Sequence, residues 1–240
     1  MDIVMQVKDV GISFGSNHVL KSLNFILAEK EVLGVIGPNG AGKTVMLDIL
    51  TGILHPTKGD ILFQGKTITD RSITERCRMG IGRTFQVPKP FEKMTVFENV
   101  TVGGIYGHRQ SEQDAQRSAL EIIRMAGLYD KREWLAGKLG LLDRKRLEIA
   151  RSLAVKPKIL LLDEVAAGLT EVEVENVLFI VKKIKELGVS VIWIEHILKT
   201  MLEGTDRILC LAQGRDVICG CPQEVMHSKT VQEVYLGTDE

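Results

Sequence analysis

The first residues that could do chemistry lie in a glycine-rich stretch, GPNGAGKT, at residues 37–44. The continuously apolar run VLGVI before it predicts a strand buried on both faces, and the stretch opens the predicted helix KTVMLDILTG. Glycines let backbone N–H groups approach phosphate oxygens, and the start of a helix adds the positive end of its dipole. The stretch therefore predicts a nucleotide site, with a glycine-rich turn that matches by chance as the alternative.

This loop fits the pattern G-x-x-x-x-G-K-[ST] in full. In that pattern the lysine reaches the β- and γ-phosphates and the hydroxyl faces Mg²⁺, which assigns these tasks to Lys43 and Thr44. The residues predicted to bind the nucleotide in this loop are Gly37, Asn39, Gly40, Ala41, Gly42, Lys43, Thr44 and Val45.

Two acidic residues close a second apolar run, ILLLDE. Asp163 and Glu164 stand where a buried strand would end, and ligands bind at the carboxyl edge of open α/β sheets. Asp163 can hold Mg²⁺ through water, and Glu164 can polarise an attacking water as a general base. Two acids that merely close a strand are the alternative, which the phosphate loop disfavours.

The elements that must position these residues alternate between strand and helix patterns. IVMQVKDV and LNFILA predict antiparallel strands, EVLGVIG predicts a buried strand, and GDILFQGKTI predicts a strand pair with a glycine turn. Further along the chain, a helix at residues 143–154, the strand KILLLD, a helix at 171–187, the strand VSVIWIE, a helix after His196 and the strand RILCLA follow one another. This alternation indicates βαβ units around a parallel sheet.

A helix-rich segment interrupts this alternation and predicts an insertion into the α/β core. Thr95 is expected to cap a helix with Glu98 three residues later, and SEQDAQRSALEIIRMAGL predicts a second helix that ends at Gly127. We therefore expect a single domain over residues 1–240, with a helical subdomain inserted at roughly 87–155 and a C-terminal β/α tail at 205–240.

Composition narrows the class of protein. Lys+Arg and Asp+Glu both number 31, and this balance argues against non-specific binding to nucleic acid or to an anionic membrane surface. No apolar run approaches the roughly 20 residues of a membrane-spanning helix, and the first ten residues do not resemble a signal peptide. The four scattered cysteines favour reduced thiols in a cytoplasmic chain.

Taken together, these motifs resemble the ATP-binding subunit of an ABC transporter, over nearly the whole chain. The resemblance implies a P-loop NTPase fold with a RecA-like parallel-sheet core, an N-terminal antiparallel β subdomain and an inserted helical subdomain. It also implies that Phe14 stacks on adenine, that Gln86 in GRTFQ contacts Mg²⁺ and couples to membrane subunits, and that His196 in WIEH senses the γ-phosphate. Each of these residues alone would be an ordinary core or loop residue, so their order and spacing carry the assignment.

The chain departs from the family pattern at several positions. Val45 replaces a hydroxyl residue, Val165 replaces a proline, and Thr170 follows AAGL where an acid or amide is common. A local role for Thr170 is to cap the next helix with Glu173. The signature motif, which in the family binds the nucleotide of the partner subunit, reads Leu139, Gly140, Leu141, Leu142 and Asp143.

The divergent signature predicts weakened phosphate binding. Gly140 lacks the serine hydroxyl, Leu142 replaces a glycine that lets the backbone approach, and Asp143 adds a negative charge. A lost charge-assisted bond to phosphate costs roughly 1.5–3 kcal/mol. The three basic residues that follow, residues 144–146, are expected in the first helical turn, facing either an anion or solvent.

The resemblance also implies a function. The segments GRTFQ and VQEVYLG are similar to the subunits that serve branched-chain amino-acid and urea or amide importers. Such a subunit hydrolyses ATP in a nucleotide-sandwich dimer, as a homodimer or a heterodimer. It binds membrane-spanning subunits at the cytoplasmic face of the membrane and acts indirectly on a substrate-binding protein. A non-transport ABC ATPase, or a regulatory ATP-binding subunit with weak turnover, stays open as an alternative.

Overall fold

The computed structural model describes residues 2–236, so the last four residues of the expected C-terminal tail lie outside it. Its strands form one ten-stranded sheet in the order β5-β4-β1-β2-β10-β9-β3-β8-β7-β6. The strands are β1 Ile3–Phe14, β2 Asn17–Ala28, β3 Val32–Ile36, β4 Lys58–Phe63, β5 Lys66–Thr67, β6 Ile81–Arg83, β7 Ile159–Asp163, β8 Ser190–Ile194, β9 Arg207–Ala212 and β10 Arg215–Gly220.

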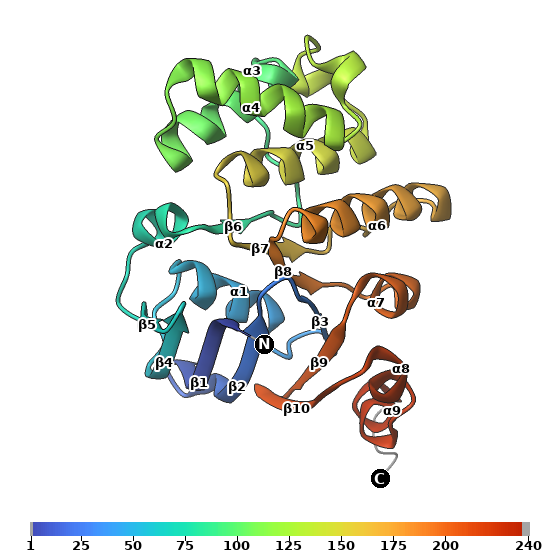
Figure 1. The fold of residues 1–240 in the computed structure, drawn as a ribbon. Coiled ribbons are helices and arrows are strands. Elements are labelled where there is room, and N and C mark those ends of the chain that lie inside the picture. The colour runs from blue at the N-terminus through green and yellow to red at the C-terminus, as the bar shows by residue number, and fades with distance from the viewer. Residues whose placement is uncertain (1, 237–240) are drawn as a thin grey trace.

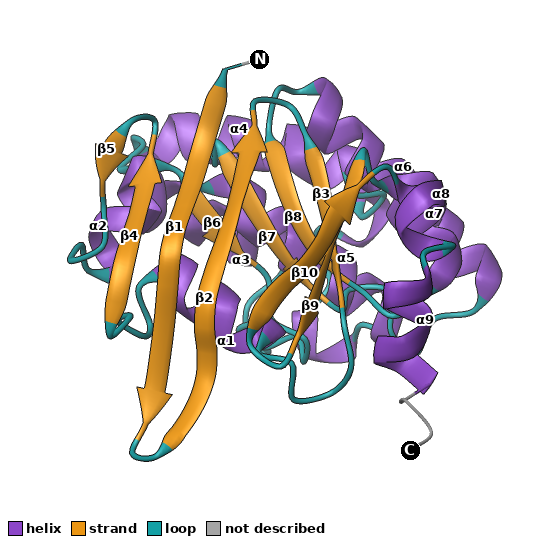
Figure 2. Cartoon of the chain, turned by 90° about the horizontal axis from the view of Figure 1, so that it is seen from below, coloured by secondary structure: helices purple, strands orange, loops and turns teal. Residues whose placement is uncertain are grey.

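The sheet has two halves with different strand directions, visible in Figure 2. β5, β4, β1 and β2 pair antiparallel, which confirms the expected N-terminal strands and the hairpin in GDILFQGKTI. β9, β3, β8, β7 and β6 pair parallel and form the α/β core. β10 pairs antiparallel with β9 and joins β2 through a single parallel pairing.

Helices pack on both faces of the parallel strands and form a separate layer above them (Figure 1). The helices are α1 Lys43–Thr51, α2 Ile73–Met79, α3 Val96–Val102, α4 Glu112–Met125, α5 Leu141–Ala154, α6 Glu171–Glu186, α7 Leu198–Gly204, α8 Pro222–Met226 and α9 Lys229–Leu236. A π-helical turn, Gly103–Gly107, extends α3, and short 3₁₀ turns at Tyr129–Lys131 and Ala136–Lys138 lead into α5.

The central strands are apolar throughout because both of their faces are buried. In β7, Ile159 and Leu161 pack into a cluster with α1 and the antiparallel strands. Leu160 and Leu162 point the other way, into a cluster that includes α6 and α7. Each residue of β7 is at most 3% exposed, so the strand places Asp163 at its carboxyl end as the last member of a fully buried run.

The helical layer formed by α3, α4 and α5 has a hydrophobic cluster of its own, which includes Val100, Ile123 and Leu147. Thr95 caps α3 in a complete capping box with Glu98, as the sequence predicts. The helix expected to end at Gly127 is α4, whose last helical residue is Met125; Ala126 is its C-cap, and Gly127 follows at φ 68°.

The predicted start of one helix is wrong in a way that matters for the site. The helix expected from residue 143 begins at Leu141, with Gly140 as its N-cap. Asp143 therefore lies in the first turn, and the basic residues 144–146 lie beyond its first three positions. The dipole penalty expected for those residues falls off within the first turn, so their position needs no anion to offset it.

Candidate nucleotide site

The phosphate loop joins the end of β3 to the start of α1, and two of its glycines are required by its close packing. Gly42 adopts φ 101° as the N-cap of α1, and a Cβ there would lie 2.6 Å from a methyl carbon of Leu20. Gly37 adopts φ 151°, and a Cβ there would lie 2.0 Å from the carbonyl oxygen of Leu211. The loop is thereby held against β2 and β9, and within residues 37–43 only Asn39 and Gly40 are exposed.

Lys43 is buried over the loop from which it extends. Its Nζ donates to the carbonyl oxygens of Gly37 at 2.7 Å and Pro38 at 3.0 Å. Burial lowers the pKa of the Lys43 ammonium, and the nearby carboxylates of Glu164 and Asp163 partly oppose this shift. The next residue, Thr44, is exposed at the first turn of α1, where its hydroxyl is available to a ligand.

Asp163 lies at the end of β7 and is 3% exposed. Its carboxylate accepts a hydrogen bond at 3.1 Å from Nη2 of Arg83, whose Nη1 contacts Asp48 of α1 at 2.5 Å. Burial raises the pKa of the Asp163 carboxyl group, while the Arg83 guanidinium acts against that shift. Arg83 is therefore a buried cation shared by two acids next to the phosphate loop.

Glu164 is the point at which three separate segments meet. Its Oε2 accepts a hydrogen bond from Nε2 of Gln86 at 2.6 Å, and its Oε1 lies 3.2 Å from Nε2 of His196. Its backbone has φ 48°, and its N–H donates to the carbonyl oxygen of Ile194 at 3.0 Å. Gln86 and His196, which were assigned by resemblance, thus both contact Glu164, although the chain separates the three residues widely.

The donors at this site suit a hard cation shared with phosphate oxygens. Thr44, Gln86 and Asp163 offer hydroxyl, amide and carboxylate oxygens, which are the ligands that Mg²⁺ prefers. Across residues 2–236, no group of three or more His, Cys, Asp or Glu side chains could hold a metal ion. A cation here would therefore depend on the phosphates of a nucleotide for part of its coordination, as Mg²⁺ usually does.

The signature segment lies at the N-terminus of α5. Gly140 is exposed with φ −70°, and a Cβ there would meet nothing within 4 Å. Leu141 is 49% exposed and lies 3.6 Å from the Cβ position of Gly168 in the AAGL loop. Leu142 is half-buried. The exposed residues of this segment are therefore Gly140 and Leu141, with Leu141 beside the AAGL loop.

The expectation that Asp143 projects its charge toward a phosphate is wrong. Asp143 is 8% exposed, and its carboxylate is paired with Lys131 and, at 3.2 Å, with Arg146. These two cations neutralise the carboxylate inside the helical layer, so it adds no unpaired negative charge to the signature surface.

The basic residues after it are engaged within the chain, which corrects the expectation of a plain solvated face. Arg144 donates to the carbonyl oxygens of Leu139 at 2.9 Å and Gly137 at 2.8 Å. Lys145 is 4% exposed, and its Nζ donates to the carbonyl oxygen of Glu164 at 3.0 Å. The basic run therefore fastens α5 to its preceding loop and to the acidic end of β7.

The remaining sequence-assigned residues lie at the edges of the site. Phe14 is 49% exposed at the end of β1, beside the turn into β2. Val165 is buried where the family has proline. Thr170 caps α6 in a complete capping box with Glu173, which confirms its predicted local role.

Sequence reasoning missed Glu195 and the contacts of Lys145 and Arg83. Glu195 is 1% exposed, and its Oε1 accepts a hydrogen bond from the N–H of Ala166 at 2.5 Å. A charged residue inside an apolar run, as in WIEH, is the signal that could have marked it as paired. No comparable signal marks Lys145 within a surface-like run of basic residues.

The fold and the site together define a P-loop nucleotide-binding protein built on a parallel α/β core. Residues 20–167, more than half of the chain, match the ABC transporter family. The chain belongs to this family and is one of its ATP-hydrolysing subunits.

Curated relatives cover almost the whole chain. The high-affinity branched-chain amino acid transport ATP-binding protein BraF of Pseudomonas aeruginosa is 33% identical over 98% of this chain and 98% of its own length. The arginine transport ATP-binding protein ArtM of Bacillus subtilis is 34% identical over 94% of each chain. A solved ATP-binding cassette of an ABC transporter in its ADP conformation has a TM-score of 0.90 and 27% identity, over 99% of this chain and 100% of that one. A dimeric cassette in a post-hydrolysis state, bound to ADP and Pi, has a TM-score of 0.81 and 27% identity, over 91% of this chain and 98% of that one.

Proposed function

We propose that this protein hydrolyses ATP to drive import of branched-chain amino acids or of other amino acids or amides. The observation that carries the hydrolytic part is the convergence of Gln86, Glu164 and His196 beside the phosphate loop. Relatives named for branched-chain amino acid and arginine transport, each more than 30% identical, support the substrate class.

The site residues divide the work of hydrolysis. Lys43 would exchange its two backbone carbonyl contacts for phosphate oxygens when ATP enters the loop. Glu164 accepts from Gln86 and contacts His196, so it is oriented to act as a general base on water. His196, in contact with Glu164, would bind and sense the γ-phosphate. Mg²⁺, held by Thr44, Gln86 and Asp163, would neutralise phosphate charge when bound.

The adenine contact and the partner contact come from different elements, the end of β1 and the start of α5. Phe14, exposed at the end of β1, supplies an aromatic face for adenine. The signature segment 139–143 would close on the nucleotide of a second ATPase subunit, and a dimeric relative bound to ADP and Pi supports such a dimer. Because Gly140 lacks a hydroxyl, we propose that this subunit gives a complete loop to one site and a weakened signature to the other.

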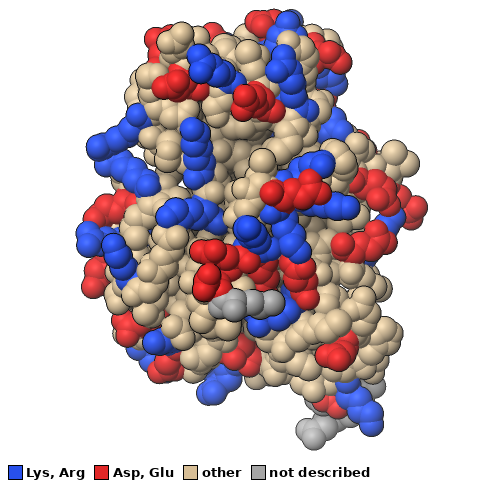
Figure 3. All heavy atoms as spheres, viewed as in Figure 1, with Lys and Arg blue, Asp and Glu red and all other residues tan. Residues whose placement is uncertain are grey.

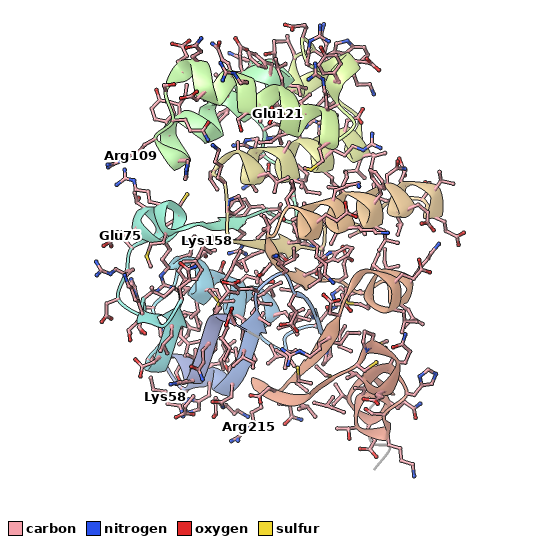
Figure 4. All side chains as sticks on the ribbon, in the orientation of Figure 1. Lys58, Glu75, Arg109, Glu121, Lys158 and Arg215 are labelled. Atoms are coloured by element: carbon pink, nitrogen blue, oxygen red, sulfur yellow. The ribbon has the colours of Figure 1, made fainter. Side chains whose placement is uncertain are left out.

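A groove between the helical layer and the α/β core offers a surface for a membrane subunit. It has a volume of about 350 Å³ and is lined by residues of α2, β6, α3 and α5, with exposed Phe85, Phe91 and Tyr106. In Figure 4, Arg109 beside the helical layer and Glu75 on α2 lie on the same side of the molecule, where these two parts face each other. We propose that residues 87–155 act as one helical subdomain that passes nucleotide-driven motion to this groove.

The surface supports a peripheral location. Within residues 2–236, no helix is long and apolar enough to cross a membrane. Basic and acidic side chains are interspersed over the face shown in Figure 3, without an extended patch of one sign that would favour nucleic acid. We therefore propose that the protein binds membrane-spanning subunits at the cytoplasmic face of the membrane and reaches the substrate-binding protein only through them.

The function can be tested by reconstituting the protein with the membrane subunits and the substrate-binding protein of an amino-acid importer. We expect leucine or a related amino acid to stimulate ATP turnover and to enter vesicles only with ATP.

Turnover of the isolated chain should be weak, and Leu142→Gly should raise it. Strong turnover alone, unchanged by Leu142→Gly, would contradict the weakened signature. Turnover that no membrane subunit stimulates would favour a regulatory or non-transport ATPase.

A further inference from the structure

Arg83 contacts both the acidic side chains beside the phosphate loop and the groove proposed to bind a membrane subunit. Its guanidinium is 7% exposed and joins Asp163, at the end of β7, to Asp48 of α1. Its Cζ also lies 5.3 Å from the centre of the Phe85 ring, a distance at which a cation is attracted to an aromatic face. One planar group therefore touches both acids next to the phosphate loop and an aromatic side chain of the groove.

The backbone around Arg83 is fixed to both layers. Its carbonyl oxygen accepts a hydrogen bond from the Ser152 hydroxyl of α5 at 2.7 Å. The next residue, Thr84, donates its N–H to Leu161 of β7 at 2.9 Å, and its hydroxyl accepts from the N–H of Asp163 at 3.2 Å. With its backbone held in this way, Arg83 can respond to the groove mainly through its side chain.

Phe85 is the exposed end of this connection. It is 47% exposed and lines the groove, so an occupant of the groove would contact its ring. A change in the ring's position would alter the plane of the Arg83 guanidinium. Because that plane sets the direction of its N–H groups toward Asp163, the change would reach the carboxylate.

We propose that Arg83 is a positioning residue that couples occupancy of the groove at Phe85 to the orientation of Asp163, and so to the affinity of the site for Mg²⁺. This inference rests on the proposed function, in which the groove binds a membrane subunit and Asp163 holds Mg²⁺. It adds a route between the two sites that does not pass through Gln86.

The chain offers a matched control for Phe85. Phe91 lines the same groove and is 46% exposed, but its ring lies 4.8 Å from Cζ of Arg151 and not beside Arg83. Arg151 pairs with Glu148 of the same helix at 3.0 Å. The substitutions Phe85→Leu and Phe91→Leu therefore remove equal rings from one groove, and only the first touches the proposed connection.

The experiment measures the Mg²⁺ concentration that gives half-maximal binding of a fluorescent ATP analogue to the isolated chain. Phe85→Leu should raise this concentration about two- to fivefold, as expected for loss of one cation–ring contact. Phe91→Leu should change it by less. In an Arg83→Met background, Phe85→Leu should have no further effect. Arg83→Met by itself also removes a charge near Mg²⁺, so the comparison is between Arg83→Met with and without Phe85→Leu. Arg83→Lys serves as a second background if Arg83→Met fails to fold.

The outcomes separate this inference from the proposed function. Equal shifts from Phe85→Leu and Phe91→Leu, or a Phe85→Leu shift that persists without Arg83, would overturn the coupling and leave the ATPase intact. Wild-type protein that binds the analogue with no dependence on Mg²⁺ would overturn the proposed metal site itself.

Discussion

The buried carboxyl group of Glu195 predicts how stability changes with pH. Glu195 follows β8, is 1% exposed, and accepts N–H groups from Ala166 at 2.5 Å and from His196 at 3.3 Å. Burial raises the pKa of this carboxyl group from 4.5 to about 7, although the two N–H groups and the charge of Lys145 act in the opposite direction. The perturbation that isolates this group is Glu195→Gln, which mimics its neutral form.

The sign follows from the direction of the shift. Between pH 4.5 and about 7, the folded protein holds a proton on Glu195 that the unfolded chain has released, so the free energy of unfolding falls as pH rises. Each pKa unit corresponds to about 1.36 kcal/mol. As pH rises across this window, ionisation of the carboxyl group therefore lowers the free energy of unfolding by about 3 kcal/mol. Glutamine does not ionise, so the variant does not show this loss.

Urea unfolding of both proteins between pH 4.5 and 8 measures this effect. The difference in unfolding free energy between variant and wild type should shift by about 3 kcal/mol in favour of the variant as pH rises. Burial also raises the pKa of Glu148 and Asp163, but these groups contribute to both proteins and cancel in the difference. Parallel pH curves for the two proteins would refute the reasoning.

Glu173 provides a control of opposite sign. Its hydrogen bonds to Thr170 lower the pKa of its carboxyl group, so the stability that it contributes is present above pH 4.5 and is lost as pH falls through the folded-state pKa. Glu173→Gln should therefore be less stable than wild type above pH 4.5, and this difference in unfolding free energy should shrink as pH falls. Glu195→Gln should instead gain stability relative to wild type as pH rises.

Three further predictions concern the helix ends. Gly140→Ser, placed at an open N-cap with φ −70°, should leave the midpoint of urea unfolding nearly unchanged and raise ATP turnover in the assembled transporter, because it restores a hydroxyl to the signature. Thr170→Ala should lower the free energy of unfolding, measured with urea, by about 0.5–2 kcal/mol. Thr170→Ser keeps a hydroxyl at the N-cap and should retain most of the wild-type stability. Arg76→Met should lower the free energy of unfolding by about 2–4 kcal/mol and should also lower the midpoint of thermal unfolding. The reason is that the fully buried guanidinium donates to four backbone carbonyl oxygens, two of them from the end of α1.

Local signals predicted the elements around the phosphate loop. VLGVI and ILLLD are apolar at every position because both faces of β3 and β7 are buried, and that pattern requires no knowledge of the partners. Capping boxes at Thr95 and Thr170 were readable because their partners stand three residues away.

Contacts between distant segments could not be predicted in this way. Lys145 stands in a run that looks solvated, yet its ammonium reaches the carbonyl oxygen of Glu164 in another element. Arg83 ends a three-residue strand that is too short to show a period, and its two acidic partners come from α1 and β7. The start of α5 was misplaced because Leu141 and Leu142 read as a loop, whereas Gly140 is the N-cap.

The central claim is that Glu164, held by Gln86 and His196, activates water at a nucleotide site formed by the phosphate loop. The most direct test compares ATP turnover and ATP binding in wild-type protein and in Glu164→Gln, both assembled with the membrane subunits. We predict that the variant binds ATP as tightly as wild type and that its turnover falls by at least about 100-fold, as expected for loss of a general base. Turnover within a few-fold of wild type would contradict the assignment of Glu164 as the catalytic base.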